Sequence, residues 1–176
     1  MCLANGTHEM SMREDDYCVV NGYVQILDMA NYTTSHALQM TPTVVKKMST
    51  FAEDATPLRQ RAVHVINAPT SLEKLFNMIK TFLPVKQQER LFIHGTNWQE
   101  PLFKNVPQKY LPKELGGENG SINELIQNHW EIFQKYRDHF LEEHKYGVDE
   151  KLRVGPSVNY DEIFGVEGSF RKLQVD

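Results

Sequence analysis

The middle of the chain carries its clearest hydrophobic pattern, a short apolar stretch followed by a helical repeat. Residues 62–66 read Ala-Val-His-Val-Ile, a composition typical of a buried strand. From Ser71 to Leu83 the large apolar residues recur at the spacing of one helical face, and Pro84 ends the pattern. Thr70 and Glu73 form a potential capping box, so we predict that the helix begins near Ser71.

The apolar face of this predicted helix is too large to remain in water. Burying six large side chains contributes roughly 9 to 18 kcal/mol, at about 1.5 to 3 kcal/mol each. This is comparable to the net stability of a whole domain, about 5 to 15 kcal/mol. The face must therefore be covered by the protein's own core, by a bound lipid or by a membrane surface. Its six residues are Leu72, Leu75, Phe76, Ile79, Phe82 and Leu83.

Basic residues bracket this helix in the sequence. Arg59 and Arg61 are two apart on a predicted extended segment, so their side chains emerge on the same side. Lys86 and Arg90 are four apart and become neighbours if the turn after Pro84 is helical. The arrangement suits a surface that meets anionic lipid headgroups and apolar tails together. The same pattern is also typical of a core helix with solvated charges on its flanks.

Two further elements are predicted before this unit. Residues 18–27 form a near-continuous apolar run rich in strand formers, as in an interior strand covered on both sides. Thr41 followed by Pro42 is a good N-cap and first helical position. The apolar stripe after it predicts a helix that extends to about Asp54.

The second half of the chain adds a strand and two helices. Residues 91–93 predict a short strand, and residues 97–105 predict a short helix. Ser121 and Glu124 give another capping box, and the apolar pattern that follows predicts one long amphipathic helix to Phe140.

Strands that alternate with helices predict an α/β domain with mainly parallel pairing and flanking helices. We expect one domain over residues 1–145. Residues 146–176 are expected to form a polar C-terminal tail that packs on the body. The clearest apolar anchors of the tail are Ile163, Phe164, Val166 and Phe170.

Composition narrows the function classes. The hydrophobic fraction of 40% and the charged fraction of 24% are those of a soluble globular protein. No apolar run is long enough to span a bilayer, and no signal peptide is recognised. Two cysteines are too few for a disulfide framework, so a reducing cytoplasm is expected. The net charge of −4 argues against general nucleic-acid binding.

Motifs for enzyme chemistry give no support for catalysis. Nucleophile-elbow, Walker and dinucleotide-binding motifs are not found. Seven histidines are present, but His139 and His144 are poorly spaced for one helical face. His64 and His94 lie on neighbouring predicted strands and can approach each other. We therefore expect no catalytic residue, no metal and no cofactor, while an unrecognised hydrolase remains an alternative.

Several stretches in order along the chain resemble one known family. They are Gly22–Asp28 (Gly-Tyr-Val-Gln-Ile-Leu-Asp), Ser35–Lys47, Pro57–Pro69 with its Asn-Ala-Pro end, Lys86–Gly95, and the Leu-Pro and Leu-Gly-Gly signature between residues 111 and 117. On these residues the chain resembles the CRAL-TRIO lipid-binding domains, a family that includes tocopherol-transfer and retinaldehyde-binding proteins. The tail resembles that of insect members. The resemblance implies an α/β sandwich whose sheet floors an apolar pocket, with a mobile helix as its lid.

The resemblance also assigns roles to residues. It places the lid at Ser71–Leu83, and it implies that phosphoinositide contacts fall on Arg59, Arg61, Lys86 and Arg90. Each implied pocket position also fits an ordinary core residue. Family members carry an N-terminal helical bundle and early strands before the segment where this chain begins, so a truncated domain is expected. The implied pocket positions are Tyr23, Leu27, Met48, Phe51, Ala52, Leu58, Val63, Phe76 and Ile79.

Together these expectations describe a non-enzymatic carrier. It binds a small hydrophobic ligand such as tocopherol or a retinoid, transfers it within the cell and unloads it at phosphoinositide-containing membranes. The protein is expected to be cytoplasmic, transiently membrane-associated and without a nucleic-acid partner. The alternative is a phosphoinositide-dependent protein-interaction scaffold without lipid cargo.

Overall fold

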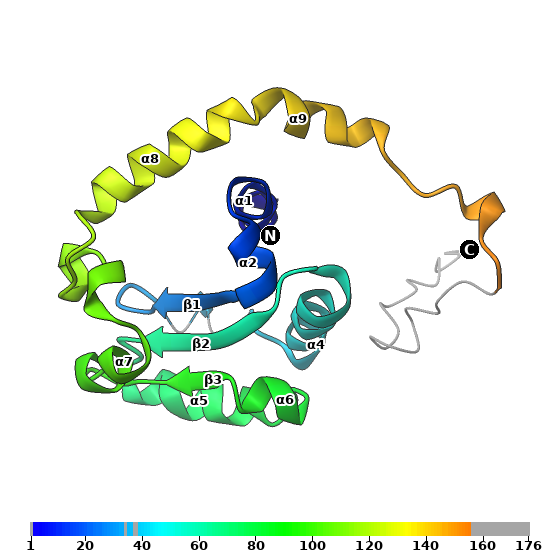
Figure 1. Cartoon of the computed structure of the whole chain (residues 1–176). Helices are drawn as coiled ribbons and strands as arrows, with labels where there is room; N and C mark the ends of the chain where they lie inside the picture. The colour runs from blue at the N-terminus through cyan, green and yellow to red at the C-terminus, as the bar shows by residue number, and fades with distance from the viewer. Residues whose placement is uncertain (1, 34, 37–38, 156–176) are drawn as a thin grey trace, which may run out of the picture.

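The computed structural model describes residues 2–33, 35–36 and 39–155. Within these ranges the chain forms a three-stranded parallel sheet with helices around it (Figure 1). The predicted α/β class with mainly parallel pairing is thereby confirmed. No helix in the described ranges is both long and apolar enough to cross a membrane. The four predicted tail anchors lie outside the described residues.

The strands lie side by side in chain order. β1 (Tyr23–Asp28) pairs with β2 (Gln60–Ile66), and β2 pairs with β3 (Leu91–Ile93), both in parallel. Each crossover contains helices, as parallel neighbours require. Successive side chains alternate between the two faces of the sheet, so Val65 and Ile66 enter different layers.

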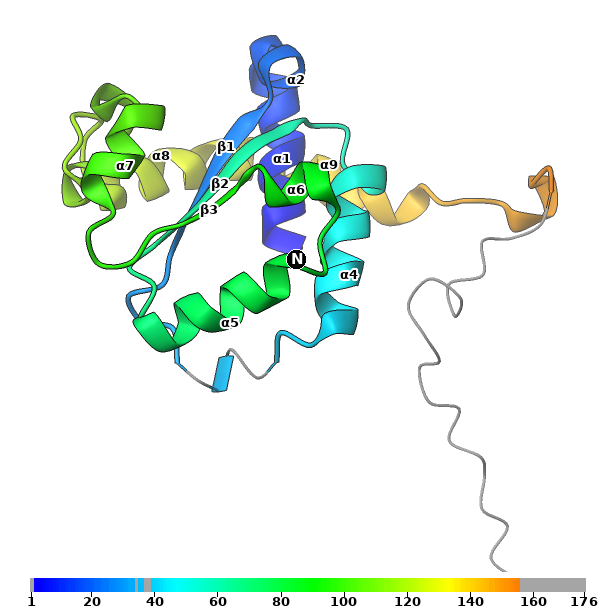
Figure 2. The same cartoon turned by 90° about the horizontal axis from the view of Figure 1, so that it is seen from below.

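Helix α5 (Thr70–Lys80) packs on the face that carries Val65, and α6 (Val85–Gln88) follows it (Figure 2). The predicted capping box is wrong because Pro69 is the N-cap and no side-chain capping hydrogen bond forms. The carbonyl of Pro69 already accepts from two backbone amides of the first turn, and Thr70 itself is helical.

Helix α7 (Gln99–Asn105) packs where the strands end (Figure 1). Ile66 and Leu102 are fully buried there, in a cluster that also contains Trp98. Trp98 Nε1 donates a hydrogen bond of 2.7 Å to Asn67 Oδ1, so the indole nitrogen keeps a partner inside the cluster. Short 3-10 turns occur at Gln108–Tyr110, Lys113–Leu115, Glu143–Lys145 and Glu150–Leu152.

Three helices form an outer layer on the β1 side of the sheet. α1 (Cys2–Glu14) crosses beside the free edge of β1, and α8 (Ile122–Lys135) and α9 (Arg137–Glu142) lie beyond it in both views (Figures 1 and 2). The Ser121 capping box is confirmed. The single long helix predicted to Phe140 is interrupted at Tyr136, whose ψ of 7° leaves the helical region.

The strand predicted over residues 18–27 is wrong in its first part. Residues before Gly22 form the short helix α2 (Asp16–Asn21), although they are rich in strand formers. Asp15 caps this helix by accepting from the Tyr17 amide at 2.9 Å, and Gly22 ends it with φ of +76°. A Cβ on Gly22 would stand 2.0 Å from the Arg59 carbonyl oxygen, so only glycine allows this approach.

Helix α4 (Pro42–Thr50) begins as predicted. Thr41 Oγ1 accepts from the Val44 amide at 3.3 Å, and Pro42 occupies the first turn. The helix continues to the predicted end as a π-helical turn, Phe51–Ala55. Figure 1 shows α4 and α6 at the end of the sheet where the strands begin.

Candidate functional site

Three of the four predicted basic residues border one recess. Arg59 immediately precedes β2, Lys86 lies on α6, and Arg90 immediately precedes β3; all three line a recess of about 220 Å³. Glu53 also lines it, so three cations and one carboxylate leave an excess of two positive charges. The other lining residues are Ala52, Thr56, Pro57, Leu58, Gln60 and Gln87.

The backbone of β2 orients one of these cations. Arg90 Nη1 donates to the Gln60 carbonyl at 2.9 Å, and the Arg90 carbonyl accepts from the Val63 amide at 2.8 Å. Arg61 is exposed on β2 and lies outside the recess lining. We refer to the site bordered by Arg59, Lys86 and Arg90 as the basic recess.

Sequence reasoning missed the uncharged amides and the carboxylate of the basic recess. Gln60 and Gln87 stand beside predicted cations, but an uncharged amide adds nothing to a charge pattern. Glu53 reaches the recess from the π-helical turn after α4, a segment that the sequence does not connect to the basic pairs. Only the folded arrangement brings these residues together.

The predicted lid helix covers the sheet with its apolar face. Leu72 is 5% exposed, Phe76 is 9% exposed and Ile79 is 7% exposed. Leu72 and Phe76 form a core cluster with Val65 and Ala68. Partly buried Leu27, Val63 and Leu75 pack against the same cluster, so these predicted lid and pocket residues do come together.

The end of α5 and the segment that follows it leave apolar residues uncovered. Met78, Phe82 and Val85 are exposed, whereas Leu83 is half-buried. Lys80 Nζ donates a hydrogen bond of 2.9 Å to the Leu91 carbonyl and so links the end of α5 to β3. An exposed apolar edge thus lies on the segment that leads into the basic recess.

The other predicted pocket residues are divided among separate cavities. Tyr23 and Leu58 line a cavity of about 500 Å³ between α1 and β1. Leu58 and Ala52 line the basic recess, and Met48 is 43% exposed. Phe51 lines a third cavity, so the structure does not gather these residues into one space.

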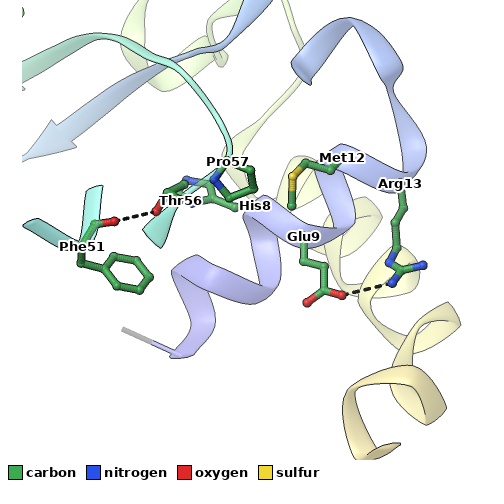
Figure 3. Close-up of a pocket in the computed structure, with 7 residues that line it drawn as sticks. All are labelled: His8, Glu9, Met12, Arg13, Phe51, Thr56 and Pro57. Carbon is green, nitrogen blue, oxygen red and sulfur yellow. Dashed lines mark hydrogen bonds and ion pairs between the residues drawn. The ribbon is translucent and has the colours of Figure 1, made fainter. Parts of the chain in front are cut away.

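Figure 3 shows this third cavity, of about 460 Å³, which sequence reasoning did not foresee. His8, Glu9, Met12 and Arg13 of α1 face Phe51, Thr56 and Pro57 across it. The Arg13 guanidinium donates to Glu9 at 3.3 Å on its rim. His8 Nδ1 is buried without a hydrogen-bond partner among the described residues, and burial lowers the pKa of His8.

The predicted approach of two histidines is confirmed. His64 Nδ1 and His94 Nε2 are 3.0 Å apart, and the His64 ring stacks on Phe92. Burial lowers the pKa of both imidazoles, and the neighbouring His94 lowers that of His64 further. The 3.0 Å separation allows one of these two nitrogens to donate a hydrogen bond to the other. In the described part of the chain, no group of three or more metal-ligating side chains gathers.

Comparison with known proteins identifies relatives of this fold. The human protein named alpha-tocopherol transfer protein-like is 37% identical over 109 residues, which are 62% of this chain and 32% of that protein. The mouse protein of that name is 36% identical over the same length. Rat clavesin-1 is 34% identical over 104 residues, 59% of this chain and 29% of its own length. The chain thus spans about a third of the length of the curated relatives it matches.

A family model agrees with these relatives. The model described as CRAL/TRIO domain matches residues 3–117, which include the sheet, α5 and the whole basic recess. The match ends before α8 and α9. The chain belongs to the CRAL/TRIO domain family.

Proposed function

We propose that this chain binds a small hydrophobic lipid, such as tocopherol or a retinoid, transfers it within the cell and unloads it at phosphoinositide-containing membranes. Membership of the CRAL/TRIO domain family supports the lipid-binding part. One relative is named for alpha-tocopherol transfer. Under this proposal the protein is cytoplasmic, associates with membranes transiently and catalyses no reaction.

The observation that carries the proposal is the position of the basic recess beside the end of α5. Arg59, Lys86 and Arg90 offer charge-assisted hydrogen bonds to phosphate groups. The neighbouring exposed side chains of Phe82 and Val85 offer apolar contact with acyl chains. A membrane surface that carries phosphoinositides presents both chemistries at once.

The proposed release step is a shift between two positions of α5. Three of its side chains are buried against the sheet, and exposing them to water costs about 4.5 to 9 kcal/mol at 1.5 to 3 kcal/mol each. A bilayer that receives this face offsets that cost, whereas water does not. The membrane therefore favours the open position, because it binds that position better.

Substitution of the two arginines tests the headgroup contact. Changing both Arg59→Ala and Arg61→Ala should weaken binding to phosphoinositide vesicles by about tenfold or more, equivalent to about 1.4 kcal/mol per tenfold, with the fold intact. Arg59→Ala alone should account for most of the loss, because Arg59 borders the recess and Arg61 does not. Lys46→Ala, an exposed cation on α4, is the matched control. Equal vesicle binding by parent and double variant would refute the headgroup role.

A scaffold without lipid cargo is the second candidate. The observation in its favour is that side chains fill the space between α5 and the sheet, while the implied pocket residues line separate cavities. Delipidated protein can be titrated with a fluorescent fatty acid to decide between the two. Uptake of the probe supports the carrier, and phosphoinositide binding without any uptake supports the scaffold.

A further inference from the structure

Helix α6 carries part of the basic recess and yet has no apolar anchor. It has four residues, and none of its side chains is buried. Four residues are too few for a helix to hold its own shape in water. Its position must therefore come from hydrogen bonds to the elements around it.

One reciprocal contact joins α6 to α4. Ser49 Oγ donates to Gln87 Oε1 at 2.8 Å, and Gln87 Nε2 donates to the Ser49 carbonyl at 3.2 Å. Ser49 is only 8% exposed, so both hydrogen bonds are shielded on its side from competition by water. We refer to this pair as the Ser49–Gln87 contact.

The same segment is fixed again at its end. Arg90 donates to the Gln60 carbonyl and accepts from the Val63 amide, so the chain after α6 is bound to β2. Gln87 itself lines the basic recess between these two attachments. Lys86 and Arg90 thus stand on a segment that is held by α4 and β2 rather than by α5.

The connection from α5 to α6 is interrupted at Pro84. Pro84 has ψ of 146°, so the helical path is broken there, and proline offers no amide to bridge the break. A side-chain hydrogen bond crosses Pro84, because Gln88 Nε2 donates to the Leu83 carbonyl at 2.8 Å. A rotation of α5 can therefore be absorbed near Pro84.

We propose that the Ser49–Gln87 contact holds the basic recess together while α5 moves, so that Gln87 is a positioning residue for an anionic headgroup. This inference rests on the proposed function. The recess and the lid are then mechanically separate, with the boundary at Pro84. A headgroup can stay bound to Arg59, Lys86 and Arg90 throughout lid opening.

Two neighbouring glutamines allow a matched test. Gln87→Ala removes the link to α4, and Gln88→Ala removes the link across Pro84; each deletes one amide from the same short helix. Vesicles of phosphatidylcholine with phosphatidylinositol bisphosphate are compared with phosphatidylcholine vesicles that carry phosphatidylserine at equal charge. Amide hydrogen exchange of α5 and α6 is followed in the same proteins.

Gln87→Ala should lower the affinity for bisphosphate vesicles about tenfold, leave the affinity for phosphatidylserine vesicles unchanged and speed exchange in α6 only. Gln88→Ala should speed exchange in α5 and leave both affinities unchanged. Ser49→Ala, which removes one of the two hydrogen bonds, should give an intermediate loss. Soluble inositol bisphosphate should displace the parent more effectively than inorganic phosphate does, which separates a headgroup site from a simple anion site.

The inference is overturned if Gln87→Ala keeps its preference for bisphosphate vesicles, if its affinity for both vesicle types falls in parallel, or if Gln88→Ala produces the same loss. The proposed function itself fails if the parent protein binds both vesicle types equally well. In that case the exchange arm still decides the mechanical part, because separate α5 and α6 responses do not depend on lipid.

Discussion

Helices α5 and α8 have similar amphipathic patterns but opposite surroundings. On α5 the apolar side chains of Leu72, Phe76 and Ile79 are all at most 9% exposed, because the sheet covers them. On α8 the side chains of Ile126 and Trp130 are 60% and 52% exposed and border an open apolar groove of about 690 Å³. The comparison shows that an apolar stripe predicts a helix but not the partner that covers it.

The means of attachment differ as well. α5 is held mainly by apolar burial, whereas α8 and α9 are attached to α1 through polar contacts. Glu14 accepts from Lys135 at 2.6 Å and from Tyr136 at 2.5 Å, and Glu9 contacts His139. Apolar contact adds to this attachment, since Gly6 allows close approach of the Phe133 ring.

The largest expected effect is a loss of stability when the buried face of α5 is changed. Phe76→Ala should lower the free energy of unfolding by about 3 to 5 kcal/mol, because it leaves a cavity in the core cluster beneath α5. Phe82→Ala is the matched control: the same change at a side chain that is 53% exposed should cost less than about 1 kcal/mol. Urea unfolding measures both. Equal losses would show that α5 is not held by its buried face.

Acid should release the outer layer before α5. Hydrogen bonds from Lys135 and Tyr136 hold the pKa of Glu14 below its ordinary value of 4.5. A lowered carboxyl pKa favours the folded arrangement above that value, and the contribution is lost as pH falls through the folded pKa. Below about pH 4.5, Trp130 emission should therefore change while α5 stays protected.

A variant identifies the group responsible for this acid step. Glu14→Gln should weaken the attachment already at neutral pH and remove its share of the acid dependence. The emission of Trp130 is isolated by subtracting the spectrum of Trp130→Phe from that of the parent. Simultaneous loss of α5 and α8 at one pH would contradict separate attachment.

The smallest expected effect concerns the open face. Ile126→Gln should change the free energy of unfolding by no more than about 0.5 kcal/mol, because the side chain is largely in water. It should nevertheless reduce binding of a hydrophobic dye to the groove on α8. Ile79→Gln, the same change on the covered face, should destabilise the fold several times more. A large loss of stability from Ile126→Gln would mean that α8 has a partner in solution.

Local patterns along the chain predicted most of the fold. The caps at Thr41 and Ser121 depend on neighbouring residues, and both were predicted correctly. Strand formers before Gly22 misled the prediction because Asp15 caps a helix there. Thr70 failed as a cap because the Pro69 carbonyl had already taken that role. The first error therefore arose where a local cap outweighed side-chain propensity, and the second where the helix begins one residue earlier than predicted.

The candidate site was only partly predictable, for a different reason. Alternation and helical spacing indicated the cations Arg59, Lys86 and Arg90, which remain candidate headgroup contacts. The Ser49–Gln87 contact joins residues 38 positions apart, so no local pattern could reveal it. Arg61 shares the pattern of Arg59 but not its surroundings, and pattern alone could not separate the two.

The direction of the strands has a consequence for anion binding. In parallel α/β folds anions commonly meet the amino ends of helices, beyond the carboxyl ends of the strands. The basic recess lies at the opposite edge, since Arg59 and Arg90 immediately precede β2 and β3, and the π-helical turn at the carboxyl end of α4 supplies Glu53. The carboxyl end of a helix carries partial negative charge. The proposed headgroup affinity must therefore come from the side-chain cations, and added salt should weaken it steeply.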